Sequence, residues 1–277
     1  MSFDGQPALY GVIGHPVKHS LSPRIHEFWY EKHQKHACYL ALDLLEASPT
    51  EDIRALGRAG FSGLNVTLPH KLSALEAAAE ISDAAMKIGA ANTLRNGQTD
   101  QGSPAWFADN TDWSGFLWSL DRWIPDLPEK ALLIGAGGAA RAVAYALGQR
   151  GVRLSILNRT PEKARALADH MNLAVDEIST LDQIETLAGD FPLVINTVSL
   201  GHSGGRIELP TTNSGYFIDI SYGAAASETL NAARASGWKT EDGLPMLVGQ
   251  AADAFNIWFG ETPDREAALK ACRDWTR

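Results

Sequence analysis

Short apolar runs alternate with amphipathic stretches along about the first 95 residues. Leu9 to Gly14, Ala37 to Leu42 and Phe61 to Val66 are rich in β-favouring residues, which predicts three strands. The segments between them, starting at Ser22-Pro23 and Pro49-Thr50, carry apolar residues at helical spacing. This alternation is typical of βαβ units and indicates an N-terminal α/β domain with a mostly parallel sheet.

Less regular elements follow in the same half of the chain. A helix is predicted from Leu68-Pro69 through an alanine-rich segment to Glu80, and Ala91 to Leu94 extends the sheet. Asn96 to Pro104 is polar and contains two glycines, so it is predicted to be a loop between two β segments without a chemical role. Trp113 to Leu120 is predicted to form a helix.

A second α/β unit is predicted from about residue 130. Its first strand, Ala131 to Ile134, leads into a glycine-rich segment and then into a helix from Ala139 to Gly148. A helix is also predicted to start at Thr160-Pro161, and further strands are predicted at Val152–Leu157, Leu193–Asn196 and Tyr216–Ile220. This order is typical of a nucleotide-binding domain.

Two helices are predicted to close the chain, Pro245 to Phe259 and Pro263 to Trp275. They have no predicted strand of their own, so their apolar faces must be buried against an element that has already formed. We expect this element to be the N-terminal domain.

The composition is that of a folded globular protein. Of 277 residues, 45% are hydrophobic and 21% are charged, which excludes disorder of the whole chain. A net charge of −9 and the lack of a basic run argue against nucleic acid or an anionic membrane as partner. The longest uncharged apolar stretch, Ala131 to Ala140, is shorter than the ~20 residues that cross a bilayer. The first residues lack a signal-peptide pattern, and only Cys38 and Cys272 occur, so a cytoplasmic location is expected.

The segment Gly135-Ala136-Gly137-Gly138-Ala139-Ala140 follows a predicted strand and opens a predicted helix. Glycines there permit a tight turn and let a pyrophosphate approach the backbone N–H groups of a helix N-terminus. The last position of the motif holds Ala140, which is also small. A plain strand-to-helix turn is the alternative interpretation.

The end of the next strand indicates which dinucleotide binds. An NAD enzyme places Asp or Glu there to bind the ribose 2′-hydroxyl, whereas this chain has Asn158-Arg159-Thr160, with Lys163 close behind. Two cations and a hydroxyl at the start of a helix suit a 2′-phosphate, so NADP is the predicted cofactor. In the alternative, Thr160 caps the helix while Arg159 and Lys163 are solvated.

Three polar segments of the first domain stand where strands give way to helices. They are His19-Ser20-Leu21-Ser22-Pro23, Asn65 to Lys71, and Asp109-Asn110-Thr111-Asp112. Hydroxyls beside a helix N-terminus suit a carboxylate ligand, although Ser22 alone would be read as a helix cap. Lys71 in a first helical turn is unfavourable unless a ligand or carboxylate compensates it; a plain surface lysine is the alternative.

These segments belong to a longer ordered series of motifs. The series is His-Ser-Leu-Ser-Pro at 19–23, Asn-Val-Thr-Leu-Pro-His-Lys at 65–71, Gly-Ala-Ala-Asn-Thr at 89–93, Asn-Thr-Asp at 110–112, the glycine-rich turn, Asn-Arg-Thr at 158–160, Asp-Ile-Ser-Tyr-Gly at 219–223 and Gly-Leu-Pro-Met-Leu-Val-Gly-Gln-Ala at 243–251. In this order, over nearly its whole length, the chain resembles the shikimate dehydrogenase family. Members reduce 3-dehydroshikimate with NADPH in chorismate and aromatic amino acid biosynthesis.

The resemblance implies a substrate domain at 1–111, a Rossmann-type NADP domain at 112–241, and helices at 242–277 that return to the substrate domain. It implies that Ser20 and Ser22 bind the substrate carboxylate and that Lys71 and Asp112 form the catalytic pair. The other residues implied to contact substrate are Thr67, Asn92, Tyr222 and Gln250. The residues implied to bind cofactor are Gly135, Ala136, Gly137, Gly138, Ala139, Asn158, Arg159, Thr160, Lys163 and Gly243.

The chemistry of carbonyl reduction fits this pair. Delivery of a hydride builds negative charge on the carbonyl oxygen, so the site needs a positioned proton donor, and a lysine is protonated at neutral pH. Asp112 would orient Lys71 and accept a hydrogen bond from a ring hydroxyl. In the oxidative direction Lys71 must lose its proton, so alkaline pH is expected to help.

The chain departs from the family pattern in three places. Asn196-Thr197-Val198 replaces the usual Asn-Ala-Thr, and His202 replaces a usual Met. The resemblance therefore does not predict which residues contact the nicotinamide ring. Lys163 stands where many NADP-preferring members have Arg, which removes a planar fork for phosphate. The segment 223–226 lacks the Pro common there.

Two other functions stay open. A quinate or quinate/shikimate dehydrogenase would usually use NAD and often carries Thr at the position of Ser22. A catalytically silent dinucleotide sensor could use the same fold, although intact Lys71 and Asp112 argue against it. The histidines between His15 and His36 fit no metal site, so no metal is expected. A homodimer is not decided by the sequence.

Overall fold

The computed structural model describes residues 5–45, 47–99, 102–198, 206–212 and 214–276. The chain forms two compact units. The first contains the described residues up to Gly115 together with Leu247–Trp275, and the second is Phe116–Met246. Two helices carry the chain from unit to unit: α5 (Asp112–Asp121) starts in the first unit, and α10 (Leu244–Phe259) ends there.

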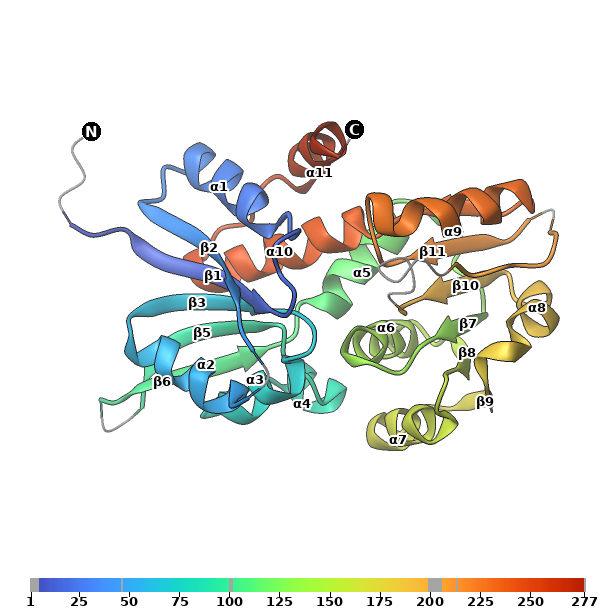
Figure 1. The fold of residues 1–277 in the computed structure, drawn as a ribbon, viewed down its shortest axis with the longest axis horizontal. Coiled ribbons are helices and arrows are strands. Elements are labelled where there is room, and N and C mark those ends of the chain that lie inside the picture. The colour runs from blue at the N-terminus through green and yellow to red at the C-terminus, as the bar shows by residue number, and fades with distance from the viewer. Residues whose placement is uncertain (1–4, 46, 100–101, 199–205, 213, 277) are drawn as a thin grey trace. The chain divides into compact units, whose positions relative to one another are not determined.

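The first unit is built on one six-stranded sheet, drawn in Figure 1. Its strands are β1 (Ala8–Gly14), β2 (Ala37–Asp43), β3 (Phe61–Val66), β4 (Glu80–Ile81), β5 (Thr93–Gln98) and β6 (Pro104–Asp109), in the order β2-β1-β3-β5-β6-β4. The helices are α1 (Ser22–Lys32), α2 (Pro49–Arg58), α3 (Lys71–Ala77), α4 (Asp83–Ile88) and α11 (Arg265–Trp275).

The pairing of these strands gathers polar residues at one edge of the sheet. β1, β2 and β3 are parallel, so their carboxyl ends meet there. β5 runs antiparallel to β3 and β6, which places Thr93 opposite Asn65 and Asp109 opposite Thr93. The end of β3, the start of β5 and the end of β6 therefore lie side by side.

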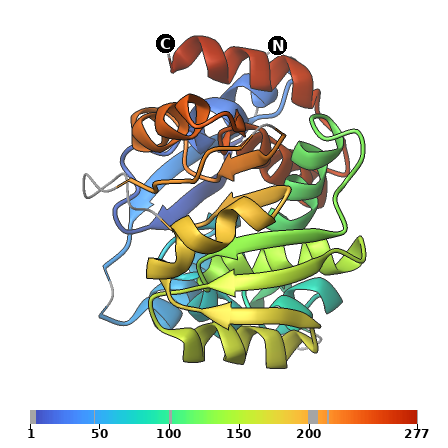
Figure 2. The same ribbon diagram turned by 90° about the vertical axis from the view of Figure 1, so that its right-hand side faces the viewer.

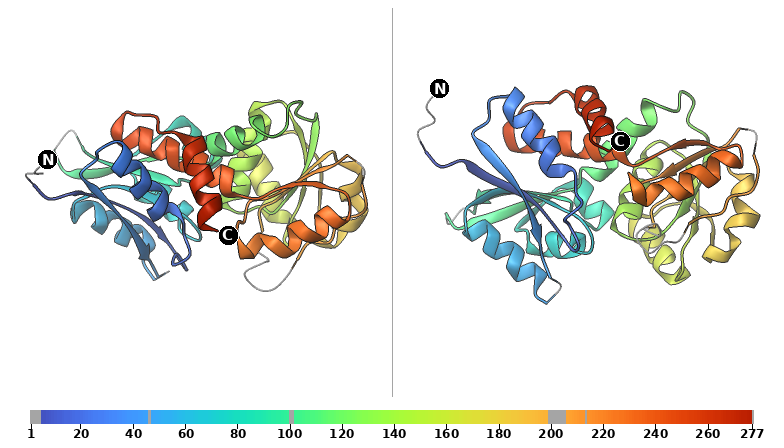
Figure 3. Two further views of the ribbon diagram at one scale, coloured as in Figure 1. Left: turned by 90° about the horizontal axis from the view of Figure 1, so that it is seen from above. Right: turned by 45° about the horizontal axis from the view of Figure 1, so that its top comes forward.

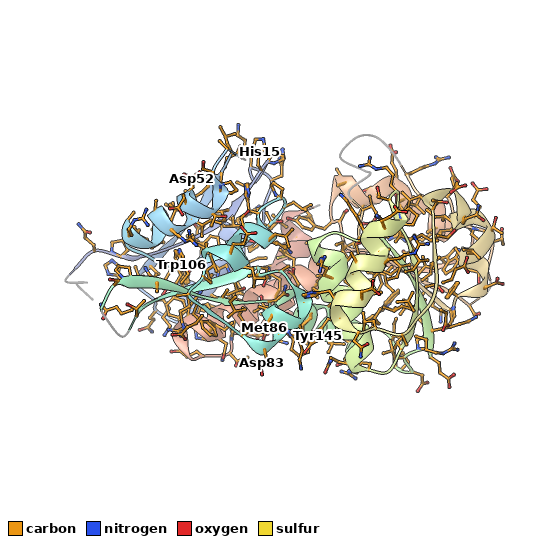
Figure 4. All side chains as sticks on the ribbon, turned by 90° about the horizontal axis from the view of Figure 1, so that it is seen from below. His15, Asp52, Asp83, Met86, Trp106 and Tyr145 are labelled. Atoms are coloured by element: carbon orange, nitrogen blue, oxygen red, sulfur yellow. The ribbon has the colours of Figure 1, made fainter. Side chains whose placement is uncertain are left out.

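Helices cover both faces of this sheet. On one face, Tyr10 of β1 and Trp29 of α1 pack against aromatic side chains of α10, and Figure 3 shows α1, α10 and α11 together. On the other face, Trp106 of β6, labelled in Figure 4, donates a hydrogen bond from Nε1 to the backbone oxygen of Ile53 in α2 at 2.8 Å. The core of that face joins Ile53 to Leu64 and Leu94, all fully buried. The polar edge is thus fixed by a core on each side.

The second unit contains a fully parallel six-stranded sheet, whose arrows run one way in Figure 2. Its strands are β7 (Lys130–Ile134), β8 (Arg153–Leu157), β9 (Val175–Ser179), β10 (Leu193–Asn196), β11 (Tyr216–Asp219) and β12 (Lys239–Glu241). The order β12-β11-β10-β7-β8-β9 reverses between β7 and β10, which is the strand order of a Rossmann fold. In such sheets ligands bind at the point of reversal.

Helices flank this sheet as well. α6 (Gly138–Gln149) and α7 (Pro161–Met171) connect β7, β8 and β9, while α8 (Ile184–Leu187) and α9 (Ala224–Ala235) precede β10 and β12. Members of α8 and α9 share one apolar core with β7, β10 and β11. The predicted α/β fold class, with a mostly parallel sheet and a Rossmann-type domain, is confirmed.

Several predicted boundaries were wrong. The helix expected from Leu68-Pro69 starts at Lys71, because residues before it form a turn in which the His70 N–H donates to the Thr67 oxygen at 3.0 Å. That helix ends at Ala77 instead of Glu80, and Glu80 is the first residue of β4. The β segment predicted at Ala91 starts at Thr93, and its strand runs on into the predicted loop as far as Gln98.

Candidate active site

Lys71 and Asp112 form an ion pair in which the lysine Nζ donates to Oδ2 of the carboxylate. Lys71 is the first residue of α3 and Asp112 the first of α5, and their side chains are 10% and 7% exposed. The unfavourable position of a lysine at a helix start is thus compensated by a buried carboxylate, as one of the two sequence interpretations required. The alternative interpretation of Lys71 as a plain surface lysine is excluded.

Asn92 connects this pair to a third element. Its Nδ2 lies 2.9 Å from Oδ1 of Asp112, 3.1 Å from Oγ1 of Thr111 and 3.2 Å from Oε1 of Gln250. Its Oδ1 accepts a hydrogen bond from the Thr111 backbone N–H at 2.6 Å. The structure therefore brings four predicted residues together, Lys71, Asn92, Asp112 and Gln250.

A second tier of polar residues supports Asn92, and the sequence interpretation did not assign it a role. Tyr39 of β2 donates from its hydroxyl to Oδ1 of Asn65 at 2.7 Å. Asn65 Nδ2 in turn contacts Oγ1 of Thr93 at 3.3 Å, and Thr93 shares a 3.0 Å hydrogen bond with Thr111. The sequence places Asn65 in a polar motif at a strand end, whereas nothing in the sequence marks Tyr39, because a tyrosine is ordinary in a strand.

Ser20 and Ser22 lie at the start of α1, and Ser22 contacts the same tyrosine. The Ser22 backbone N–H donates to Oγ of Ser20 at 3.2 Å, so the two residues lie together as predicted for a shared ligand. Burial raises the pKa of the Tyr39 phenol well above its usual range, and a hydrogen bond with Ser22 opposes the shift. Ser22 makes no side-chain cap of α1, whose N-cap is Leu21, so the capping interpretation of Ser22 was wrong.

Thr67 closes the same end of the sheet, after β3. Its methyl group packs so closely on Gly14 that a Cβ added to that glycine would lie 2.4 Å from Cγ2. The Thr67 N–H donates to the Ile13 oxygen at 2.9 Å, which continues the β1–β3 pairing. His70, which precedes Lys71, bonds through Nε2 to the Leu44 oxygen at 2.7 Å and fixes the start of α3 to the segment after β2.

A buried aromatic layer supports the back of the polar cluster. The His26 ring stacks on Tyr39 with centroids 4.3 Å apart and planes 5° from parallel. Burial lowers the pKa of His26 to about 3, an effect that its contact with Asn65 opposes only in part. The imidazole is therefore neutral at physiological pH, and it acts as an aromatic support for Tyr39 rather than as a charge.

In the second unit, the glycine-rich turn lies at the point where the strand order reverses. Gly135 has φ of +113°, and a Cβ there would lie 2.3 Å from Oγ1 of Thr197, which follows β10. Gly137, the N-cap of α6, has open space where its Cβ would be, so a ligand can approach its backbone. Ala136, Gly138 and Ala139 complete the turn.

Thr197 marks a departure from the family pattern and has a structural partner here. Its Oγ1 donates to the Ile134 oxygen at 2.7 Å, beside a bond from its backbone N–H to the same oxygen at 2.8 Å. The hydroxyl of Thr197, which follows β10, therefore holds the end of β7 by a hydrogen bond. His202, the other departure, lies outside the described residues.

The segment after β8 presents the residues predicted to bind a 2′-phosphate. Asn158 donates from Nδ2 to the Thr160 oxygen at 2.7 Å and so shapes the turn into α7. Arg159, Thr160 and Lys163 are exposed, as both interpretations of this segment allow. Thr160 makes no side-chain cap of α7, so the capping part of the alternative was wrong. Both cations are therefore accessible at the helix start.

Tyr222 and Gly243 lie close to the carboxyl end of β11. Asp219 accepts from Asn196 Nδ2 at 3.0 Å and from the Ser221 N–H at 2.9 Å, which fixes the segment that leads to Tyr222. Gly243 donates from its N–H to the Ser221 oxygen at 2.9 Å, and a Cβ there would lie 1.9 Å from the Ile220 oxygen. This close approach requires glycine at 243.

The described residues contain no group of three or more His, Cys, Asp or Glu side chains arranged to hold a metal ion. Within the same residues, no helix is both long and apolar enough to cross a membrane. The second unit has a parallel sheet in Rossmann order with an open glycine turn, and the first unit holds a buried ammonium–carboxylate pair. Together these features define the class of protein, a dinucleotide-dependent oxidoreductase built from two units.

Comparison with known proteins identifies the family. Residues 12–94 match the model of the shikimate dehydrogenase substrate binding domain, residues 123–221 that of shikimate/quinate 5-dehydrogenase, and residues 243–273 that of the shikimate 5′-dehydrogenase C-terminal domain. A relative from Hyphomonas neptunium, named shikimate dehydrogenase (NADP(+)), is 44% identical over 266 residues, which cover 96% of each chain. This chain belongs to the shikimate dehydrogenase family, as its motifs predicted.

Solved structures agree with this assignment. Shikimate dehydrogenase from Aquifex aeolicus has a TM-score of 0.86 and 33% identity, with 99% of this chain and 100% of that chain covered. The enzyme from Thermus thermophilus, solved with NADP(H) and shikimate, has a TM-score of 0.80 and 35% identity, with 96% of this chain and 99% of that chain covered.

Proposed function

We propose that this protein catalyses the reversible NADPH-dependent reduction of 3-dehydroshikimate to shikimate. The observation that carries the proposal is the buried Lys71–Asp112 pair, held beside Asn92 and Gln250 by hydrogen bonds. Curated relatives named shikimate dehydrogenase (NADP(+)) support the choice of substrate and cofactor.

The cofactor fits the second unit. The open space over Gly137 admits a pyrophosphate to the N-terminus of α6, and the cradle between Gly135 and Thr197 leaves no room for a side chain at 135. Arg159, Thr160 and Lys163 would hold the 2′-phosphate with two positive charges and a hydroxyl. When bound, NADPH supplies the hydride for carbonyl reduction.

Lys71 would serve as general acid for the carbonyl oxygen. Its ammonium group is held by Asp112 at a buried position, so it can donate a proton as negative charge develops on the substrate oxygen. Asp112 keeps Oδ2 on the lysine while its Oδ1 is held by Asn92, so the carboxylate is fixed through both oxygens. In oxidation the same lysine must first be neutral and take up the proton.

The remaining roles concern substrate orientation. We assign the substrate carboxylate to Ser20 and Ser22, whose hydroxyls stand at the α1 N-terminus. Thr67, Asn92 and Gln250 would contact the ring hydroxyls, and Tyr222 stays a predicted substrate contact. On this proposal the first unit is the substrate domain, joined by α11 and most of α10, and the second is the cofactor domain. A cytoplasmic location and a homodimer stay predictions.

A panel of substrates and cofactors tests the function. The absorbance of NADPH or NADH is followed with 3-dehydroshikimate, and that of NADP or NAD is followed in reverse with shikimate or quinate. The proposal expects the highest kcat/KM with NADP and shikimate. Higher kcat/KM with quinate and NAD would establish quinate dehydrogenase instead, and dinucleotide binding without turnover of any substrate would establish the silent sensor.

A further inference from the structure

The first turn of α5 contacts the middle of α10 through two glycines, Gly115 and Gly249. A Cβ added to Gly249 would lie 2.7 Å from Cα of Gly115, so the two backbones are in direct contact. Asp112 lies three residues before one glycine, and Gln250 directly follows the other. The separation of these two side chains therefore depends on how α5 and α10 are held at this crossing, which can be followed in Figure 1.

A charged side chain holds the helices beside the crossing. Ser114 of α5 donates from Oγ to Oδ2 of Asp253 in α10 at 2.6 Å, and Arg265 of α11 pairs with Oδ1 of the same carboxylate. Burial raises the pKa of the Asp253 carboxyl, while the hydrogen bond from Ser114 and the charge of Arg265 oppose the shift. One carboxylate thus joins three helices.

We propose that Asp253, acting through Ser114 and Arg265, is a positioning residue that sets the distance between Asp112 and Gln250. Asp253 is three residues after Gln250 and Ser114 two after Asp112, so each partner is within one helical turn of a site residue. Asn92 Nδ2 spans those two side chains with contacts of 2.9 and 3.2 Å, which leaves little tolerance for a shift of either helix.

The space around the clamp favours a local effect over a general collapse. Ser114, Asp253 and Asn256 line a hollow of about 410 Å³, and Ser114 and Asp253 are only half-buried. Removing the Ser114 hydroxyl therefore creates no dry cavity in the core. Ser114 and Arg265 are the hydrogen-bond partners of Asp253 among the described residues, so a change in the site after Ser114→Ala would come through the crossing.

The experiment combines Ser114→Ala, Asp253→Ala and the double variant. We expect each single substitution to raise the KM for shikimate by about 3–10-fold, with the KM for NADP within about twofold of the parent. Because Ser114 acts through Asp253, the double variant should be no worse than Asp253→Ala. Thr262→Ala is the matched control: Thr262 accepts from Asn256 of α10 at 3.1 Å without reaching α5, so its KM for shikimate should not change.

A merely structural role predicts another result. The thermal midpoint and the fraction of active enzyme would fall, while the KM for shikimate would stay within twofold of the parent, and this outcome overturns the proposal. If Asp253→Ala does not fold, the KM for shikimate of Ser114→Ala alone tests the proposal, and a value within twofold of the parent overturns it. The inference rests on the proposed roles of Asp112 and Gln250, so Asp112→Asn and Gln250→Ala are measured in parallel. Parent-like kinetics in both Asp112→Asn and Gln250→Ala would refute the proposed function. Slower kinetics in these two variants, together with a parent-like KM for shikimate in Ser114→Ala, would refute only the positioning role.

Discussion

Lys71 and Asp112 are 41 residues apart in sequence, yet their side chains form a buried ion pair at the starts of two different helices. Breaking such a pair leaves one charge without compensation in a buried site. The pair is therefore informative about catalysis only if its two members are tested together as well as singly.

For Lys71→Ala we expect turnover to fall by about 10²–10⁴-fold, the usual contribution of a general acid. The dissociation constant for NADPH, measured by fluorescence titration, should stay nearly unchanged. Asp112→Asn keeps the shape but removes the charge that orients the ammonium group, so its loss should also be large. The double variant should lose less than the product of the two single losses. Multiplicative losses would show independent action and refute the paired mechanism.

Replacing both Ser20 and Ser22 by Ala should mainly raise the KM for shikimate. A carboxylate remote from the reacting carbonyl is bound equally in the ground state and the transition state, so kcat should change little. Initial rates over a range of shikimate concentrations measure this. Ser73→Ala, a half-buried serine of α3, is the control and should behave like the parent. An unchanged shikimate affinity in the double variant would show that the carboxylate binds elsewhere.

Arg159→Asp should raise the KM for NADP by at least about tenfold. The change removes a charge-assisted contact worth about 1.5–3 kcal/mol and introduces repulsion of the 2′-phosphate. The KM for NAD, which lacks that phosphate, should rise much less. Arg165→Asp, within α7 and six residues after Arg159, supplies the control for a change in net charge. Equal effects on NADP and NAD would remove Arg159 from the phosphate site.

His26 should make the folded protein sensitive to acid. Its pKa is lowered to about 3 by burial, against an ordinary value of about 6.5, so between these values the unfolded chain binds a proton that the folded protein excludes. Stability is therefore lost as pH falls through this window, by about 2–3 kcal/mol between pH 7.5 and 4.5. His26→Phe keeps a ring against Tyr39 and should show a pH-induced loss smaller by that amount in urea unfolding.

The exposed His19 gives the matched comparison for this prediction. His19→Phe should leave the pH dependence of unfolding as it is in the parent. If His26→Phe loses as much stability on acidification as the parent does, the imidazole must accept its proton in the folded state, contrary to its burial.

The sequence by itself determined the class of fold, the family and most of the candidate site. Apolar runs flanked by Ser-Pro, Pro-Thr and Gly-Ala-Gly-Gly segments are local signals, because strand and helix starts depend on neighbouring residues. The polar motifs stand at strand ends and helix starts. They gather at one edge of the sheet because β1, β2 and β3 are parallel while β5 runs antiparallel to β3 and β6. Phe61–Val66 and Leu193–Asn196 are strands with the predicted bounds.

The tertiary structure decided what local signals do not contain. The alanine-rich run after Lys71 has helical propensity throughout, yet Glu80–Ile81 pairs with β6, since strand pairing is a contact between distant residues. Tyr39 and Asp253 carry no motif; they matter because β2 and α10 bring them against Asn65 and Ser114. The sequence around Lys71 is compatible with a solvated or a buried lysine. The lysine is buried because folding places the carboxylate of Asp112, 41 residues away in sequence, against it.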